Sequence, residues 1–257
     1  MNIEDLTPVE YIDSMNVYVK RDDLFTVFGM HGGKSRAAYQ IINQLKNKGY
    51  NDIVTAGSRH SPQCEIVSYI CENLNLNCHV FMPFGEETSV IKNISKNSRT
   101  KIIRVKPAYN NVLSSKSLKY ANENNFGYVP FGMECKENID ITCNQVLNIP
   151  NEVQRIVVPI GSGMTFCSII NGLLKHNINK PILGVQVGKD PKLVIKKYAP
   201  LSKFVDYTII KSSVDYSISV NHSVGTISLD PIYEAKCFDY LKANDLLWIV
   251  GRRLEEV

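Results

Sequence analysis

The stretch RIVVPIGSGMT, residues 155–165, joins a run of branched apolar residues to a glycine turn and the start of a helix. Such a run predicts a strand that is buried on both faces, as in a parallel sheet covered by helices. The glycine turn points backbone N–H groups outward, and a helix N-terminus favours a phosphate dianion. The stretch therefore predicts either a tight structural turn or a phosphate site formed by Gly161, Ser162, Gly163, Met164 and Thr165.

Strands and helices alternate on both sides of this stretch. The hydrophobic pattern predicts strands at residues 16–20, 52–56, 77–82, 101–105, 128–130, 155–160, 182–187 and 246–250. It predicts helices at residues 35–47, 62–72, 88–97, 111–124, 136–147, 165–176, 191–198 and 232–241. This alternation is typical of an α/β fold with parallel sheets flanked by helices. Residues 50–135 carry a strand–helix pattern of their own, so we expect a smaller inserted domain there, and a large domain formed by residues 1–49 and 136–257.

The composition fits a soluble globular protein. Hydrophobic residues make up 44% of the 257 residues, and the formal net charge is 29 − 25 = +4. No run of basic residues concentrates this charge, so nucleic acid is a possible partner that the composition does not indicate. The N-terminus lacks the basic start and apolar core of a signal peptide, and no apolar stretch reaches membrane-spanning length. We expect a cytoplasmic protein without a membrane partner.

The seven cysteines predict neither a metal site nor a disulfide framework. None of them forms a Cys-x-x-Cys pair, and an odd number without a secretion signal favours reduced thiols. Cys64, Cys71 and Cys78 recur at a spacing that would place the first two on one face of a helix, where they act as small buried apolar residues. We expect no metal.

A lysine at a predicted helix start is the candidate for covalent chemistry. In the segment HGGKSR, residues 31–36, two glycines precede Lys34, so the backbone can pass close to a planar ring. The positive end of the helix dipole disfavours the ammonium form and lowers the lysine pKa, which favours Schiff-base formation. A solvent-exposed lysine in a basic turn is the alternative. An amine for an aldehyde and a cradle for a phosphate together indicate pyridoxal phosphate chemistry.

Two further segments carry polar groups at useful positions. GSRHSPQ, residues 57–63, follows a predicted strand, so its side chains would lie at the sheet edge where ligands of open α/β folds bind. Arg59, His60, Ser61 and Gln63 are candidates to face a substrate carboxylate or a cofactor ring, and an ordinary polar loop is the alternative. LDPIYEAK, residues 229–236, predicts a helix start with Asp230 as the N-cap and a capping-box-like Glu234.

These segments, in this order, resemble the fold type II pyridoxal-phosphate enzymes, the tryptophan synthase β-like group. Within that group they are most similar to the 1-aminocyclopropane-1-carboxylate deaminase and D-cysteine desulfhydrase branch. The similarity rests on KRDD at residues 20–23, GGKSR at residues 32–36 and LDPIYEAK at residues 229–236. The resemblance implies two open twisted, mostly parallel sheets flanked by helices, with the cofactor in the cleft between the domains. It also implies a homodimer and a small-molecule amino acid as substrate.

The resemblance further implies roles for single residues. Lys34 would form the internal aldimine with pyridoxal 5'-phosphate and act as the catalytic base, and residues 161–165 would hold the phosphate. Ser61 would be catalytic and, with Gln63 and His60, would bind the substrate. Tyr216 would be a catalytic tyrosine near the substrate. The implied activity is that of a lyase or deaminase on an amino acid.

The chain departs from the pattern of this branch at several positions. Gly33 and Pro62 stand where asparagines are usual, and the acidic residue that some members place near the pyridine nitrogen falls at Gly225. Fewer residues than usual separate Tyr216 from Asp230, which removes a segment that walls the pocket. Two alternatives follow: a catalytically degenerate protein that binds the cofactor, or an enzyme acting on an amino-acid group attached to a larger molecule such as a modified nucleobase in DNA. A Rossmann-type nucleotide enzyme is disfavoured, because no Gly-x-Gly-x-x-Gly unit is present.

Overall fold

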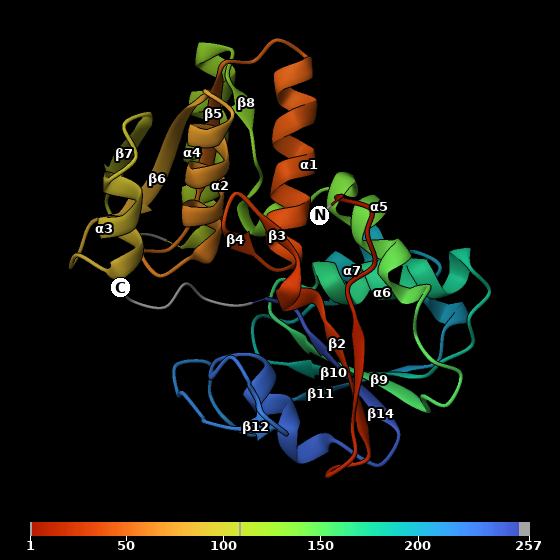
Figure 1. Ribbon diagram of the computed structural model, residues 1–257. Coiled ribbons are helices and arrows are strands. Elements are labelled where there is room, and N and C mark those ends of the chain that lie inside the picture. Colours follow the sequence, from red (N-terminus) through yellow and green to blue (C-terminus); the bar gives the residue numbers. More distant parts are fainter. Residues whose placement is uncertain (1, 108, 252–257) are drawn as a thin grey trace. The chain divides into compact units, whose positions relative to one another are not determined.

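The computed structural model describes residues 2–107 and 109–251, and these fall into two compact units (Figure 1). The first unit comprises residues 2–25 and 139–251, and the second comprises Thr26–Asn138. Each contains a largely parallel sheet flanked by helices, which confirms the predicted α/β class. No helix in the described ranges is long and apolar enough to cross a membrane.

The first unit is built on a six-stranded sheet in the order β1-β2-β14-β9-β10-β11. Every neighbouring pair in it is parallel except β1 and β2, which are antiparallel. The six strands are β1 (Val9–Ile12), β2 (Val17–Arg21), β9 (Arg155–Ile160), β10 (Ile182–Gln186), β11 (Tyr207–Lys211) and β14 (Asp245–Ile249). The predicted buried strand at residues 155–160 is therefore an interior strand of this sheet.

Apolar residues alternate between the two faces of this sheet. In β14, Leu246 and Trp248 pack into one core cluster, whereas Leu247 and Ile249 pack into another. The first cluster includes the buried face of α6 (Met164–Lys175), and the second includes the segment from Leu229 to Cys237. Both faces of the sheet are thus covered, which explains why its strands are apolar without polar alternation.

Short helices and one hairpin complete the first unit. The helices are α5 (Lys136–Thr142, which begins in the second unit), η3 (Cys143–Val146), α7 (Lys192–Tyr198), η4 (Ser202–Phe204) and η5 (Glu234–Tyr240). The hairpin pairs β12 (Ser223–Val224) with β13 (Ile227–Ser228).

The second unit is built on a four-stranded parallel sheet in the order β7-β6-β5-β8. Its strands are β5 (Asp52–Ala56), β6 (Asn77–Pro83), β7 (Thr100–Val105) and β8 (Gly127–Tyr128). Four α-helices flank the sheet, namely α1 (Gly33–Asn47), α2 (Pro62–Asn73), α3 (Ser89–Ser95) and α4 (Asn110–Asn124). The unit also contains a hairpin of β3 (Thr26–Val27) and β4 (Met30–His31), and the short helix η2 (Phe131–Met133).

The units divide the chain at a different first boundary from the predicted domains. The pattern of strands suggested that residues 1–49 belong to the large domain, because the helix at 35–47 precedes the first strand of the inserted segment. In the structure, α1 packs on the second unit's own sheet: a methyl group placed on Gly127 would stand 3.2 Å from the side chain of Leu45. The second unit therefore begins at Thr26, and it ends at Asn138 where residue 135 was expected.

Most predicted elements lie where the pattern placed them, and the exceptions have physical reasons. The predicted helix at 136–147 divides into α5 and the 3-10 helix η3, and the predicted helix at 232–241 is the 3-10 helix η5. The strands β1 and β11 were not predicted. Both are edge strands with partly exposed side chains, so they lack the apolar run that marks an interior strand.

Candidate functional site

Lys34 lies in the first turn of α1, as its sequence context predicted. The helix begins at Gly33, and its N-cap is the buried Gly32 with φ +91°, a left-handed conformation that favours glycine. The Lys34 side chain is partly buried, and the next residue, Ser35, donates its hydroxyl proton to the carbonyl oxygen of His31 at 2.7 Å. The amine is therefore presented by a short, internally bonded turn.

Ser61 lies at the start of α2, in the same unit as Lys34. It is the N-cap residue of α2, and its hydroxyl is not used to cap that helix. A methyl group on Gly57 would stand 2.5 Å from Sγ of Cys64 and 2.9 Å from Oγ of Ser61, so both side chains pack on this glycine. Burial raises the pKa of the Cys64 thiol far above its usual range, while a hydrogen bond with Ser61 and the positive charge of Lys34 lower it. The second unit thus brings Lys34 and Ser61 within electrostatic reach of one thiol.

Gln63 and His60 occupy contrasting environments in this loop. Gln63 is buried, and its amide nitrogen donates to Oγ1 of Thr55 at 3.0 Å and to the carbonyl oxygen of Pro130 at 2.8 Å. It therefore fixes the start of α2 to β5. His60 is exposed. Their assignment as substrate-binding residues stays a prediction, and for Gln63 the contacts add a supporting role.

Arg59 ties the same loop to the segment that follows β6. Its Nη1 donates to the carbonyl oxygen of Glu86 at 3.0 Å, and its guanidinium packs on Gly85. Its own carbonyl oxygen accepts a hydrogen bond from Oγ1 of Thr88 at 2.5 Å. Arg59 therefore holds the loop in place through its contacts with residues 85–88.

The glycine turn of the first unit has the form of a phosphate cradle. It connects β9 to α6, and Gly163, with φ +91°, is the N-cap of the helix. Within the described ranges, no group accepts a hydrogen bond from the N–H of Ser162, Gly163 or Thr165. The hydroxyl-bearing Ser162 and Thr165 are partly buried. Free N–H groups at a helix start, with two hydroxyl groups beside them, fit a phosphate dianion.

The cradle is closely packed on both sides. A methyl group on Gly161 would stand 2.8 Å from Cε1 of Tyr233, and one on Gly188 would stand 2.7 Å from the carbonyl oxygen of Gly161. A methyl group on Gly163 would meet Val194 of α7 at 3.3 Å. The segment after β10, helix α7 and Tyr233 therefore surround the turn.

Tyr216 is linked to this cradle through Tyr233. The two hydroxyl oxygens are 3.2 Å apart, and the rings meet edge to face. Lys236 donates from Nζ to the carbonyl oxygens of Asp215 at 2.6 Å and Tyr216 at 3.2 Å, and burial lowers its pKa. The Tyr216 side chain is 50% exposed, so one of its faces is open to solvent. The first unit thus gathers the predicted Tyr216 and the predicted glycine turn.

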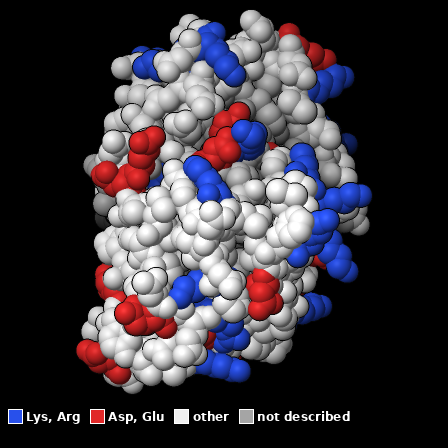
Figure 2. All heavy atoms as spheres, turned by 90° about the vertical axis from the view of Figure 1, so that its right-hand side faces the viewer, with Lys and Arg blue, Asp and Glu red and all other residues white. Residues whose placement is uncertain are grey.

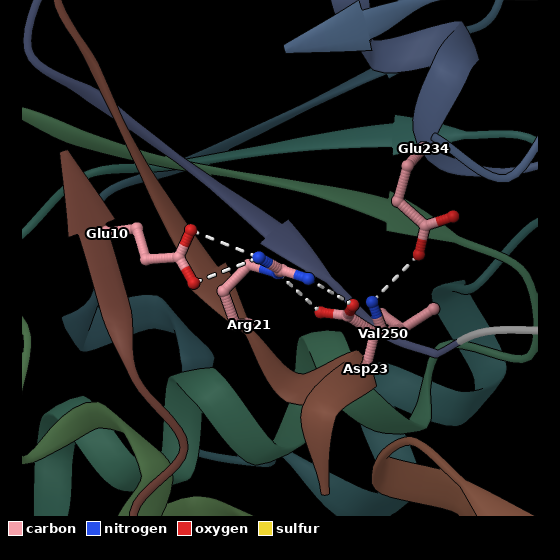
Figure 3. A network of polar contacts seen from close by, with 5 residues as sticks. All are labelled: Glu10, Arg21, Asp23, Glu234 and Val250. Carbon is pink, nitrogen blue, oxygen red and sulfur yellow. Dashed lines mark hydrogen bonds and ion pairs between the residues drawn. The ribbon is translucent and has the colours of Figure 1, made fainter. Parts of the chain in front are cut away.

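Glu234 has a buried carboxyl group, and only one of its two oxygens accepts a hydrogen bond among the described residues. Its Oε1 accepts a hydrogen bond from the backbone N–H of Val250 at 2.8 Å (Figure 3). Its Oε2 is buried and has no hydrogen-bond partner among the described residues. Burial, reinforced by the charge of Asp230, raises the pKa of Glu234 to about 8. Glu234 follows Tyr233, whose ring packs on Gly161, and its own carboxyl group bonds to the residue that follows β14.

The sequence pattern predicted a different structural role for Glu234. It suggested a capping box with Asp230, whose Oδ1 does accept from the N–H groups of Ile232 and Tyr233 at 2.8 and 3.0 Å. Glu234 bonds to the end of β14, which no local pattern reveals. Gly225, which stands where some members of the branch carry an acidic residue, lies in the β12–β13 turn with φ +59° and packs against Ile12.

The motif at residues 20–23 is part of the scaffold. Lys20 is fully buried, and its Nζ donates to the carbonyl oxygen of Thr7 at 2.8 Å and to Oδ1 of Asn148 at 2.7 Å. Arg21 binds Glu10 and Asp23 with N–O distances of 2.9 Å (Figure 3). These bonds fix the end of β2. No group of three or more potential metal ligands occurs in the described part of the chain.

Comparisons with known proteins agree with this geometry. A family model described as "Pyridoxal-phosphate dependent enzyme" matches residues 2–221. Proteins from Thermotoga maritima and Pyrococcus horikoshii, provisionally named as 1-aminocyclopropane-1-carboxylate deaminases, are 23% and 24% identical over 90% of this chain, and the matches cover 86% and 82% of their own lengths.

Solved structures show the same fold. The crystal structure of an ACC deaminase homologue has a TM-score of 0.79 and 22% identity, and the match covers 97% of this chain and 90% of that one. Maize serine racemase has a TM-score of 0.69 and 15% identity, with 97% and 88% covered.

Proposed function

The chain belongs to the family of pyridoxal-phosphate dependent enzymes, with pyridoxal phosphate as cofactor, and from this premise we propose that it is a lyase or deaminase acting on an amino acid. The observation that carries the proposal is the position of Lys34 in the first turn of α1, in the unit that also holds Ser61 at the start of α2. An amine that attaches an aldehyde is what such a reaction needs, and a hydroxyl group can bind the substrate carboxylate.

Different residues of this chain would bind the aldehyde, the phosphate and the ring nitrogen of the cofactor. Lys34 would supply the amine for the aldehyde. The free N–H groups of Ser162, Gly163 and Thr165, with the hydroxyls of Ser162 and Thr165, would hold the phosphate. Glu234, through its unpartnered oxygen, is the group that would face the ring nitrogen. It would take the role of the acidic residue that some members of the branch carry at the position of Gly225.

When bound, the cofactor withdraws electrons from the α-carbon of the amino acid attached to it. Lys34 then takes a proton at Nζ and returns it to the product, as a general base and acid. The Ser61 hydroxyl donates to the substrate carboxylate. Tyr216, whose hydroxyl is paired with that of Tyr233, would exchange a proton with the substrate side chain. The enamine product tautomerises to an imine, and water hydrolyses its C=N bond to give a 2-oxo acid and ammonia, which completes a lyase or deaminase reaction.

A screen for products tests the proposal. Purified protein with added pyridoxal phosphate is incubated with L- and D-amino acids and with 1-aminocyclopropane-1-carboxylate, and the 2-oxo acid and ammonia released are measured. We expect equal amounts of both from at least one compound. Binding of the cofactor without release of either product from any compound would contradict turnover of free amino acids, and would leave a degenerate cofactor-binding protein or an enzyme for an amino-acid group attached to a larger molecule.

Gly161→Ala is expected to weaken cofactor binding about tenfold, since the added methyl group would press on the Tyr233 ring and displace the cradle. The measurement is a titration of pyridoxal phosphate by absorbance. The double variant Gly161→Ala/Tyr233→Ala should lose less affinity than the sum of the two single losses, because removal of the ring relieves the collision. Strictly additive losses would show that the two residues act independently.

A further inference from the structure

The first unit exposes a row of lysines beside the glycine turn. Between residues 189 and 204 the chain carries five lysines and one acidic residue, a local charge of 5 − 1 = +4, which equals the net charge of the whole chain. The lysines are all exposed, and they are Lys189, Lys192, Lys196, Lys197 and Lys203. We call the exposed side chains of residues 189–204 the basic ridge. The segment has no uninterrupted run of basic residues, yet it gathers positive charge locally.

The basic ridge adjoins the proposed cofactor site. Helix α7 lies against the cradle, since a methyl group on Gly163 would meet Pro191 at 3.5 Å and Val194 at 3.3 Å. The ridge continues from α7 to η4, which contacts α6. Figure 2 shows that Lys and Arg side chains gather along one edge of the face it displays, with few acidic ones between them. An anionic partner bound along the ridge would therefore approach the cradle.

A hollow at the far end of the ridge carries groups that indicate what kind of anionic partner binds there. It has a volume of about 260 Å³ and is bordered by Phe204, Val205, Asn177, Asn179 and apolar residues of α6. Phe204 is 67% exposed, and Nζ of Lys203 lies 5.0 Å from its ring centre. Within the described ranges, the side-chain amides of Asn177 and Asn179 form no hydrogen bond. An aromatic face, two free amides and a neighbouring cation are the groups that bind an unstacked nucleobase.

We infer that the basic ridge binds single-stranded nucleic acid, with its phosphates along the lysines and a base in the hollow beside Phe204. Helix α6 has 12 residues, so the hollow and the cradle lie about 18 Å apart along its axis. A strand held at the hollow can therefore bring a nucleotide a few positions along the strand to the cradle. The inference deepens the proposed function, on which this last step rests, by naming nucleic acid as the carrier of the amino-acid group.

A lipid surface is the competing partner. Leu193 and Leu201 are 81% and 55% exposed, and exposed leucines among lysines are also found where proteins contact anionic membranes. Nucleic acid is favoured because the aromatic residue borders a hollow with amide groups, which a membrane would leave unused. Vesicles therefore form one arm of the test.

The test measures binding of a fluorescein-labelled single-stranded DNA by anisotropy across a range of NaCl concentrations. Three lysines spread along the ridge are removed together in Lys189→Ala/Lys196→Ala/Lys203→Ala. We expect at least tenfold weaker binding at low salt and a plot of log K against log salt that is less steep by about 2. Phe204→Ala should weaken binding about tenfold without changing that slope.

The matched control removes three exposed lysines of the second unit, Lys92→Ala/Lys96→Ala/Lys116→Ala, and should bind DNA like the unmodified protein. Equal losses in both triple variants would overturn the inference, as would binding to anionic phosphatidylserine vesicles without binding to DNA. Cofactor absorbance is recorded for every variant. Since the ridge lysines do not hold the cofactor, DNA binding that is lost while the absorbance is unchanged separates this inference from the proposed function.

Discussion

Lys34→Ala is expected to lower turnover by about 10³-fold or more, because no other group replaces the amine that attaches the cofactor and moves the proton. The visible absorbance of the attached cofactor should disappear in the same variant. The phosphate cradle lies in the other unit and is unchanged, so pyridoxal phosphate should still bind, with reduced affinity. The measurement combines absorbance spectra with the release of 2-oxo acid from whichever substrate the product screen identifies.

Two controls separate chemistry from folding. Lys48→Ala removes an exposed lysine from the other end of the same helix and should leave both readings unchanged. Added methylamine should restore part of the activity of Lys34→Ala, because a free amine can take the place of the missing side chain. If Lys34→Ala keeps the absorbance of the unmodified protein, another residue attaches the cofactor and the assignment of Lys34 is wrong.

Glu234→Gln is expected to remove a pH dependence of stability. The pKa of Glu234 is raised by burial from 4.5 to about 8, so the folded protein holds this proton more tightly than the unfolded chain does. The stabilisation is complete below pH 4.5 and is lost as the pH rises through 8. The loss amounts to about 5 kcal/mol, from a shift of about 3.5 units at 1.36 kcal/mol each.

Glutamine keeps the oxygen that accepts from Val250 and carries no charge at any pH, so this loss should be absent from the variant. The free energy of unfolding by urea is measured at pH 5 and at pH 9. The difference in the free energy of unfolding, variant minus unmodified protein, should be larger at the higher pH than at the lower pH by several kcal/mol. Glu87→Gln, at an exposed position, is the control and should show no such gain. If the unmodified protein and Glu234→Gln differ in the free energy of unfolding by the same amount at both pH values, Glu234 is not a buried neutral carboxyl group.

The sequence predicts those parts of the molecule that depend on neighbouring residues. The apolar run of β9, its glycine turn and the start of α6 are encoded within residues 155–165, and the start of α1 at Gly33 follows from two glycines and the periodic pattern behind them. Such signals are local, because a strand, a turn and a helix start each depend on a few adjacent side chains.

The remaining site features depend on contacts between distant segments. The local sequence pattern predicts a capping role for Glu234. Its bond to Val250 joins η5 to the end of β14, and a local pattern cannot reveal such a contact. Tyr233 was not singled out, although its ring packs on Gly161, far away in the sequence. The second unit begins at Thr26 and not at residue 50, a difference that a helical pattern does not reveal because it does not show which sheet the helix covers. Each of these features is determined by tertiary packing, which the periodicity of one segment does not report.

The pairing of β2 with β14 determines when the first unit can be completed. Its second strand lies between the N-terminal strand and the last strand of the chain, so a nascent chain on the ribosome leaves β1 and β2 without their sheet until residues 245–249 have emerged. The second unit is contiguous from Thr26 to Asn138 and can fold before that. Synthesis that stops shortly before β14 would therefore release a chain with a folded insert and an N-terminal hairpin exposed to proteases.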